Sequence, residues 1–190
     1  MKTKTCFYFV AETPLHDRNL KPWMEAVLGK KLEWQTIHPD QWVFFSEDVS
    51  RQPLQTFLDT YQQEHKGKFH LLKTYRIHPL GEQVSRLGLK KNPGKVDLMG
   101  DFLLQRVLEG QVSLLPTIRD EFASVPRHLM QTAAMLIDSN MNASIASERL
   151  YVHRNTFNYR LNQFVNLTGL DVRQHDHALL FTLVEKLLMR

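Results

Sequence analysis

Cysteine and long apolar runs are the features this sequence has least of. Its 190 residues include one cysteine, Cys6, so no disulfide can form within the chain. No apolar stretch approaches the length of a membrane span, and the run that follows Met1–Lys4 ends at Glu12, which is too short for a secretory signal. These absences predict a cytoplasmic protein that does not enter a membrane.

The motifs of the common enzyme classes are also missing. The sequence contains no Gly-x-Gly-x-x-Gly loop, no paired-carboxylate motif and no Ser/His/Asp or Cys/His arrangement. The segment Asn92-Pro93-Gly94-Lys95 shares a glycine and a lysine with phosphate-binding loops, but it lacks their spacing and the Ser or Thr that follows the lysine. We therefore expect a protein that is not an enzyme and that needs no cofactor.

Nine histidines raise the possibility of a metal site. Only His175 and His177 are close neighbours in a single short segment, and both fall at the expected start of a helix. Side chains two residues apart in a helix point in different directions, so a shared ion would need further ligands. We expect no metal site. The scattered histidines include His16, His38, His65, His70, His78 and His128.

The composition is that of an ordinary globular protein with a mildly basic balance. Hydrophobic residues make up 43% of the chain and charged residues 23%, which gives ample core material for one medium or two small domains. The formal net charge of +4 permits a polyanionic partner without requiring one.

The first part of the chain alternates strand-like and helix-like patterns. Apolar and aromatic runs with period-two alternation predict strands, and apolar residues at helical spacing predict two helices between them. The resulting order, β-α-β-β-α-β, is that of a ferredoxin-like sandwich with a four-stranded antiparallel sheet and both helices on one face. The predicted strands are 5–11, 32–37, 42–45 and 69–77, and the predicted helices are 20–28 and 54–61.

The remainder of the chain is predicted to be helical. Turn residues and charge over 87–95 favour a linker, followed by helices over 96–108 and 114–122. The sequence therefore predicts an α+β protein with three parts. These are an α/β regulatory or dimerisation domain at 1–80, a helical connector at 81–126 and a helix-turn-helix domain at 127–190. No residue of the first part indicates a small-molecule effector.

The last part carries the pattern of a helix-turn-helix. An apolar helix over 129–137 precedes Asn142, a good N-cap for a helix of two turns over 143–150. Tyr151 and Val152 separate it from a longer helix over 153–166. Gly169 follows where a left-handed C-terminal cap is expected, and 176–188 forms a last amphipathic helix.

Side chains of the longer predicted helix divide into an inner and an outer set. Packing two helices closely needs a small residue, Ala146, and apolar residues around the turn, for which Ile145, Leu150 and Val152 are suitable. Phe157, Leu161 and Phe164 repeat at helical spacing and should face inward. The outer set has the side chains that read base edges and phosphates in the major groove. It comprises His153, Arg154, Asn155, Thr156, Tyr159, Asn162 and Asn166.

Three linked blocks in this region resemble the C-terminal helix-turn-helix of PucR/CdaR-type transcriptional regulators. They are His153-Arg154-Asn155-Thr156, Tyr159-Arg160-Leu161 and Leu167-Thr168-Gly169-Leu170-Asp171, in the family's order and spacing. The resemblance covers residues 127–190. It implies a Fis-like bundle, sequence-specific binding of duplex DNA by a homodimer, and a recognition helix that begins at His153, with Asn158 and Tyr159 one turn further on.

Two positions leave alternatives open. Arg160 either braces the motif, with Glu148 as a hypothetical partner across the turn, or contacts a phosphate. Tyr151 stands where many helix-turn-helix motifs have Gly, because that residue often takes a positive φ. An aromatic residue there is common in the resembled family.

The charge of this region suggests a dimer. Seven arginines and lysines against five acidic residues leave residues 127–190 with a net charge of +2, so one copy should bind DNA weakly. A two-fold dimer would double the contacts. The rival interpretation is a protein-interaction or assembly module whose helix-turn-helix no longer binds DNA.

Overall fold

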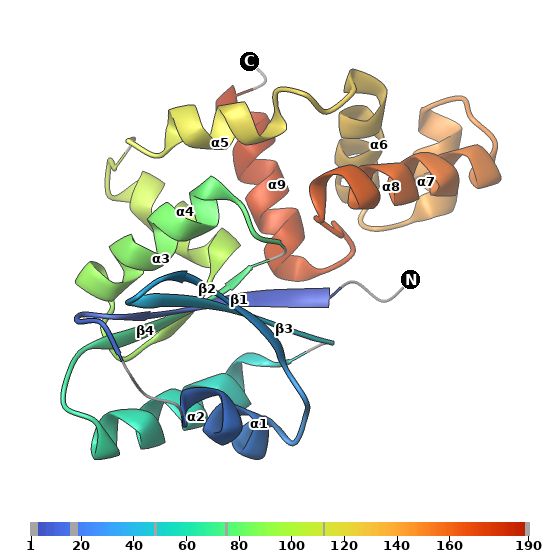
Figure 1. The fold of residues 1–190 in the computed structure, drawn as a ribbon. Coiled ribbons are helices and arrows are strands. Elements are labelled where there is room, and N and C mark those ends of the chain that lie inside the picture. The colour runs from blue at the N-terminus through green and yellow to red at the C-terminus, as the bar shows by residue number, and fades with distance from the viewer. Residues whose placement is uncertain (1–3, 16–18, 48, 75, 112, 189–190) are drawn as a thin grey trace. The chain divides into compact units, whose positions relative to one another are not determined.

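The chain folds as two compact units. The computed structural model describes residues 4–15, 19–47, 49–74, 76–111 and 113–188, and it divides the chain into Met1–Phe102 and Leu103–Arg190. The first unit is a sheet with helices on both faces, and the second is helical wherever regular structure is described (Figure 1). This confirms the predicted α+β class.

The sheet of the first unit has five strands in the order β2-β3-β1-β4-β5. The first four strands pair antiparallel, and their order is the predicted ferredoxin-like one. The fifth strand pairs parallel to β4 and was not predicted. The strands are β1 (Lys4–Ala11), β2 (Glu33–His38), β3 (Gln41–Glu47), β4 (Phe69–Thr74) and β5 (Val96–Leu98).

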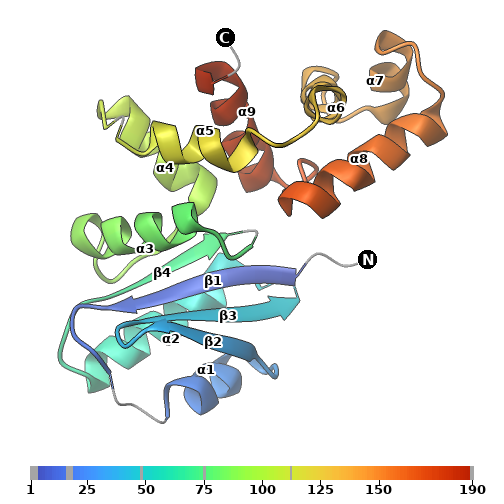
Figure 2. The same ribbon diagram turned by 45° about the horizontal axis from the view of Figure 1, so that its top comes forward.

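Both predicted helices cover one face of the sheet, as expected (Figure 2). They are α1 (Leu20–Leu28), closed by Gly29 at φ 64°, and α2 (Arg51–Glu64). Aromatic rings fill the space between helices and sheet, because Phe9 stacks on Phe69 at 5.7 Å and meets Tyr61 edge-on at 5.5 Å. Burial of these rings supplies most of the apolar core on this side.

A third helix, α3 (Pro79–Lys91), covers the opposite face, and the sequence analysis missed it (Figure 2). It approaches the sheet very closely at two glycines. A Cβ at Gly81 would lie 2.6 Å from the Tyr8 ring, and one at Gly88 would lie 2.1 Å from the His70 imidazole. The linker predicted over 87–95 is therefore wrong for its first part, which continues this helix to Lys91.

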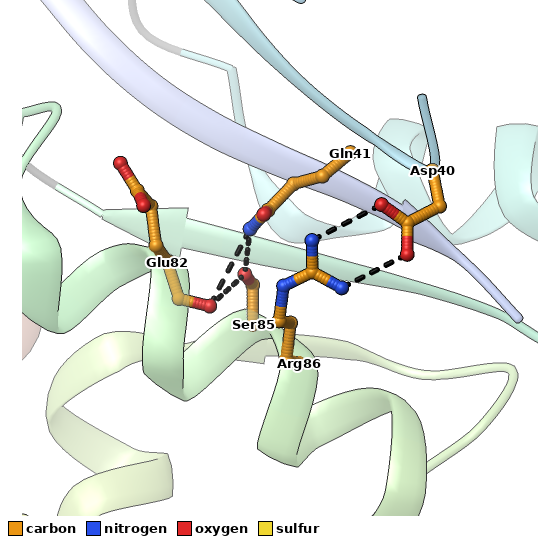
Figure 3. Close-up of polar contacts among 5 residues, drawn as sticks. All are labelled: Asp40, Gln41, Glu82, Ser85 and Arg86. Atoms are coloured by element: carbon orange, nitrogen blue, oxygen red, sulfur yellow. Dashed lines mark hydrogen bonds and ion pairs between the residues drawn. The ribbon is translucent and has the colours of Figure 1, made fainter. Parts of the chain in front are cut away.

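Polar contacts attach α3 to the turn between β2 and β3 (Figure 3). The Arg86 guanidinium donates two hydrogen bonds, of 2.9 and 3.0 Å, to the Asp40 carboxylate, and this pairing lowers the pKa of Asp40. Beside them, the fully buried Gln41 donates through Nε2 to Ser85 Oγ at 2.7 Å. These polar contacts therefore hold α3 against the sheet.

The segment after α3 also differs from its prediction. Residues predicted as one helix over 96–108 form β5 and then α4 (Met99–Leu108). The division between units falls at Phe102 and Leu103, whereas boundaries were predicted at residues 80 and 126. The difference arises because α3 and β5 complete the sheet unit instead of leading away from it.

The second unit consists of five further helices in the described part of the chain. Its first helix, close to the predicted 114–122, packs against the last one. None of the helices described in either unit is long and apolar enough to cross a membrane. The helices are α5 (Leu115–Phe122), α6 (Arg127–Asp138), α7 (Ala143–Arg149), α8 (Arg154–Thr168) and α9 (His175–Leu188).

Candidate nucleic-acid interface

Helices α6, α7 and α8 pack against one another as a three-helix group, with a tight turn between α7 and α8 (Figure 1). The predicted elements are confirmed, with ends shifted by one or two residues. Short helix, turn and longer helix is the arrangement in which one helix enters the major groove while its partner supports it.

The inner set of side chains holds this group together. Ala146 and Phe157 are fully buried and Leu161 is nearly so, while Leu150 and Val152 at the turn are half-buried. Phe164 meets Phe181 of α9 edge-on at 5.4 Å, which ties α8 to the last helix. Ile145 differs from its prediction, because 42% of its surface is exposed and it does not frame the turn.

Asn142 and His153 fix where the two helices begin. Asn142 Oδ1 accepts hydrogen bonds from the backbone N–H groups of Ser144 at 3.1 Å and Ile145 at 3.2 Å, as its predicted capping role requires. His153 precedes α8 and its Nδ1 accepts from the N–H of Asn155 at 3.2 Å. Its imidazole therefore has a structural role at the end of the helix that would face DNA.

The outer set of side chains lies on the exposed face of α8. All seven predicted residues are exposed, as is Asn158, and Arg154 makes no hydrogen bond or ion pair within the described chain. Tyr159 is 63% exposed and accepts a hydrogen bond from Gln163 Nε2 at 3.1 Å. The structure thus brings together His153, Arg154, Asn155, Thr156, Asn158, Tyr159, Asn162 and Asn166 on one helix and its N-terminal end.

Arg160 is half-buried beside this face. No hydrogen bond or ion pair joins it to Glu148 in the described part of the chain, so the hypothetical pair across the turn is not formed. Arg149, at the end of α7, is turned toward the preceding helix and donates to the carbonyl of Asp138 at 3.2 Å. Arg154 and Arg160 are therefore the cations of α8 that remain for a polyanion.

The turn between α7 and α8 closes on a left-handed tyrosine. The N–H of Val152 donates to Ser147 O and that of Tyr151 donates to Glu148 O, both at 3.0 Å, which is the Schellman pattern. Tyr151 occupies the position that favours glycine, with φ 55°, and 95% of its surface is exposed. For a non-glycine residue this conformation costs about 1–2 kcal/mol. The sequence left a positive φ open at this position and did not place Tyr151 among the site residues.

The Leu-Thr-Gly-Leu-Asp block after α8 has a structural role. Gly169 ends the helix at φ 76°, as predicted, and Thr168 Oγ1 accepts from the N–H of Leu170 at 3.0 Å. Asp171 receives two hydrogen bonds from the Arg173 guanidinium, of 2.6 and 2.8 Å, and this contact raises the pKa of Arg173. The block therefore orients α9 and is not part of the exposed face of α8.

Among the described residues no group of three His, Cys, Asp or Glu side chains is placed to hold a metal ion. His177 is buried, and its Nδ1 accepts from the backbone N–H of Asp171 at 2.9 Å. The site consequently has hydrogen-bond donors, amides and a guanidinium to offer a ligand.

Comparison with known proteins finds similarity within the second unit. Residues 129–186 match the family described as the PucR C-terminal helix-turn-helix domain. A stretch of 52 residues is 42% identical to the carbohydrate diacid regulator of Escherichia coli (strain K12), covering 27% of this chain and 14% of that protein. A stretch of 88 residues is 30% identical to the protein YxkF of Bacillus subtilis (strain 168), covering 44% of this chain and 29% of that protein.

These alignments span less than a third of either relative's own length. Among solved structures, a regulator of polyketide synthase expression from Bifidobacterium adolescentis aligns over 95% of this chain and 78% of its own, at 16% identity and a TM-score of 0.46. The resemblance to PucR-type regulators that the sequence predicted is confirmed for the helix-turn-helix domain.

Proposed function

We propose that this chain is a transcriptional regulator that binds duplex DNA through α8, as a dimer with two copies of the helix-turn-helix. One observation carries the proposal. The N-terminal half of α8 exposes arginine, asparagine and threonine side chains, while Ala146, Phe157 and Leu161 are buried behind it. Such a face can donate to guanine and adenine edges and to phosphates. The PucR-type domain and the regulator relative support the same function.

The residues have different roles in this proposal. Arg154 and Asn155, in the first turn, would reach base edges, and Asn158, Tyr159 and Asn162 follow along the groove. Thr156, His153 and Arg160 would contact the backbone around them. The effector of the E. coli relative does not transfer, because the alignment covers 14% of that protein. A regulator that acts by occupying a DNA site would work in the cytoplasm and would need no catalytic activity.

The rival proposal, an assembly module, rests on the net charge of +2 over residues 127–190. With so few cations, phosphate contacts alone would give one copy only weak affinity. The two proposals differ in whether the side chains at the start of α8 matter for binding of duplex DNA.

The deciding experiment compares wild type with Arg154→Ala/Asn155→Ala by fluorescence anisotropy on a labelled random-sequence duplex pool over a salt series. We expect wild-type binding to weaken as salt rises, and the variant to bind less tightly with a salt slope smaller by about one. Arg119→Ala is the matched control, because it removes one exposed positive charge from α5, outside the motif. Equal binding by wild type and variant, or no binding at low salt, would favour the assembly module.

A further inference from the structure

Tyr151 has a positive φ, a conformation that the described chain otherwise gives to five glycines, to Asn140 and to Met141. The helices α1, α4, α6 and α8 are each followed by a residue with positive φ, and those residues are Gly29, Gly110, Asn140 and Gly169. Glycine has no Cβ to strain this conformation, and asparagine tolerates it better than other residues do. After α7 the same conformation is taken by a tyrosine.

Nothing within the described chain repays this strain. Tyr151 is 95% exposed, the most exposed of the large apolar and aromatic residues, and its hydroxyl has no hydrogen-bond partner there. The backbone hydrogen bonds of the turn would form equally well with glycine. Strained residues of this kind persist where the side chain serves a function, so the observed conformation points to an external partner.

The place of Tyr151 identifies the class of partner. It precedes His153 by two residues, so its Cα lies within about 7 Å of the Cα of His153, the N-cap of α8. That helix end is the one that enters the groove in helix-turn-helix complexes, and the flanking surface there is the sugar-phosphate backbone. Tyrosine hydroxyls are regular phosphate ligands, and a neutral donor needs no counter-charge from the protein.

We propose that the Tyr151 hydroxyl donates a hydrogen bond to a backbone phosphate beside the groove entered by α8. The proposal rests on the DNA-binding function proposed above. Because a phosphate is present at every step of the duplex, the contact strengthens binding to all sequences equally. It adds a contact to a domain whose net charge is only +2. The gain in affinity accounts for retaining a residue that destabilises the turn.

The test measures affinity and stability together in Tyr151→Phe, Tyr151→Gly and wild type. We expect both variants to bind about tenfold more weakly, equally on a selected duplex and on a scrambled one, because a hydrogen bond to a charged group is lost. The salt slope should not change, since no counterion-releasing charge is removed. The melting temperature should stay constant in Tyr151→Phe and rise by about 2–4 °C in Tyr151→Gly.

Asn140→Gly is the matched control, because it relieves the corresponding position after α6 without touching the turn. It should raise stability and leave DNA affinity unchanged. Wild-type affinity in Tyr151→Phe would overturn the phosphate contact, whether or not Tyr151→Gly binds weakly. A changed oligomeric state in light scattering would assign Tyr151 to a protein contact instead. If wild type binds no DNA, the proposed function fails as well; if it binds and only Arg154→Ala/Asn155→Ala weakens it, this inference alone fails.

Discussion

Two helices of this protein, α3 and α8, are N-capped by a histidine. Each cap needs a ring nitrogen that accepts a hydrogen bond. In both His78 and His153, Nδ1 accepts a hydrogen bond from a backbone N–H, at 3.2 Å in each case. A protonated imidazole has no acceptor nitrogen, so protonation of His78 removes its cap. The difference lies in burial, because His78 is 4% exposed while His153 faces solvent. Loss of the cap at His78 therefore leaves a charge inside the first unit.

Acid should destabilise the first unit through His78. Burial, and then the charge of Arg76, lower the pKa of His78 from 6.5 to about 3. The unfolded chain therefore binds a proton below pH 6.5 that the folded chain resists, so the stabilisation is complete above pH 6.5 and is lost progressively toward pH 3. The pKa of His70 is also lowered, chiefly by burial, so this residue adds to the loss of stability in acid.

The measurement is urea unfolding of wild type and His78→Asn between pH 4 and 8. Asparagine also caps a helix but does not titrate in this range. We expect the slope of unfolding free energy against pH to fall by up to about 1.4 kcal/mol per pH unit below pH 6. Between pH 7 and 8 the difference between the two proteins should be constant. Parallel curves across the whole range would show that His78 is not the responsible group.

Among the helices and strands, those predicted correctly are the ones whose own apolar residues recur at helical or strand spacing. The helix over 20–28, the strands over 32–37 and 42–45 and the helix-turn-helix were all predicted close to their observed bounds. The helix α3 was missed although Leu80, Val84 and Leu87 recur at helical spacing, because the glycine and lysines of its second half are also typical of a linker. The strand β5 has three residues and depends on its pairing with β4, which no local pattern reveals.

The small residues of α3 should be required for its packing. In Gly88→Ala the new Cβ would lie 2.1 Å from Nε2 of the fully buried His70, so helix or sheet must shift. Overpacking of this kind costs about 1–3 kcal/mol, against a gain of about 1 kcal/mol in helix propensity. We expect a net loss of unfolding free energy in thermal or urea denaturation. The control is the same change in a His70→Ala background, where alanine leaves room and Gly88→Ala should stabilise. Additive effects would show that the two residues do not meet.

The candidate site could be predicted largely from the sequence because its polar and charged side chains lie on one continuous helix. Spacing alone places Arg154, Asn155 and Asn158 on the surface once Phe157 and Leu161 are buried. The exposure of Tyr151 and the turning of Arg149 toward Asp138 could not be predicted, because both depend on how the chain closes between helices. The missing pair between Glu148 and Arg160 has the same cause.

For the whole molecule, the small net charge of the helix-turn-helix domain favours a function in which two copies bind DNA together. A net charge of +2 over residues 127–190 gives one copy few phosphate contacts, and a two-fold dimer doubles them. Two recognition helices in such a dimer read half-sites about one helical turn, or 10–10.5 base pairs, apart. The spacing of half-sites, and not only their sequence, should therefore determine affinity.

An insertion of about five base pairs between the half-sites of a selected duplex should reduce affinity to that of a single half-site, because it turns one site to the opposite side of the helix. An insertion of about ten base pairs returns both half-sites to the same side of the duplex. It should recover part of the lost affinity, as far as the linkage between the two copies can stretch. Anisotropy titrations of the three duplexes, with a one-half-site duplex as control, measure this. Arg154→Ala/Asn155→Ala should show little dependence on spacing, since its residual binding is to phosphates. If the wild type binds all four duplexes equally, each copy acts alone and the proposed dimer is wrong.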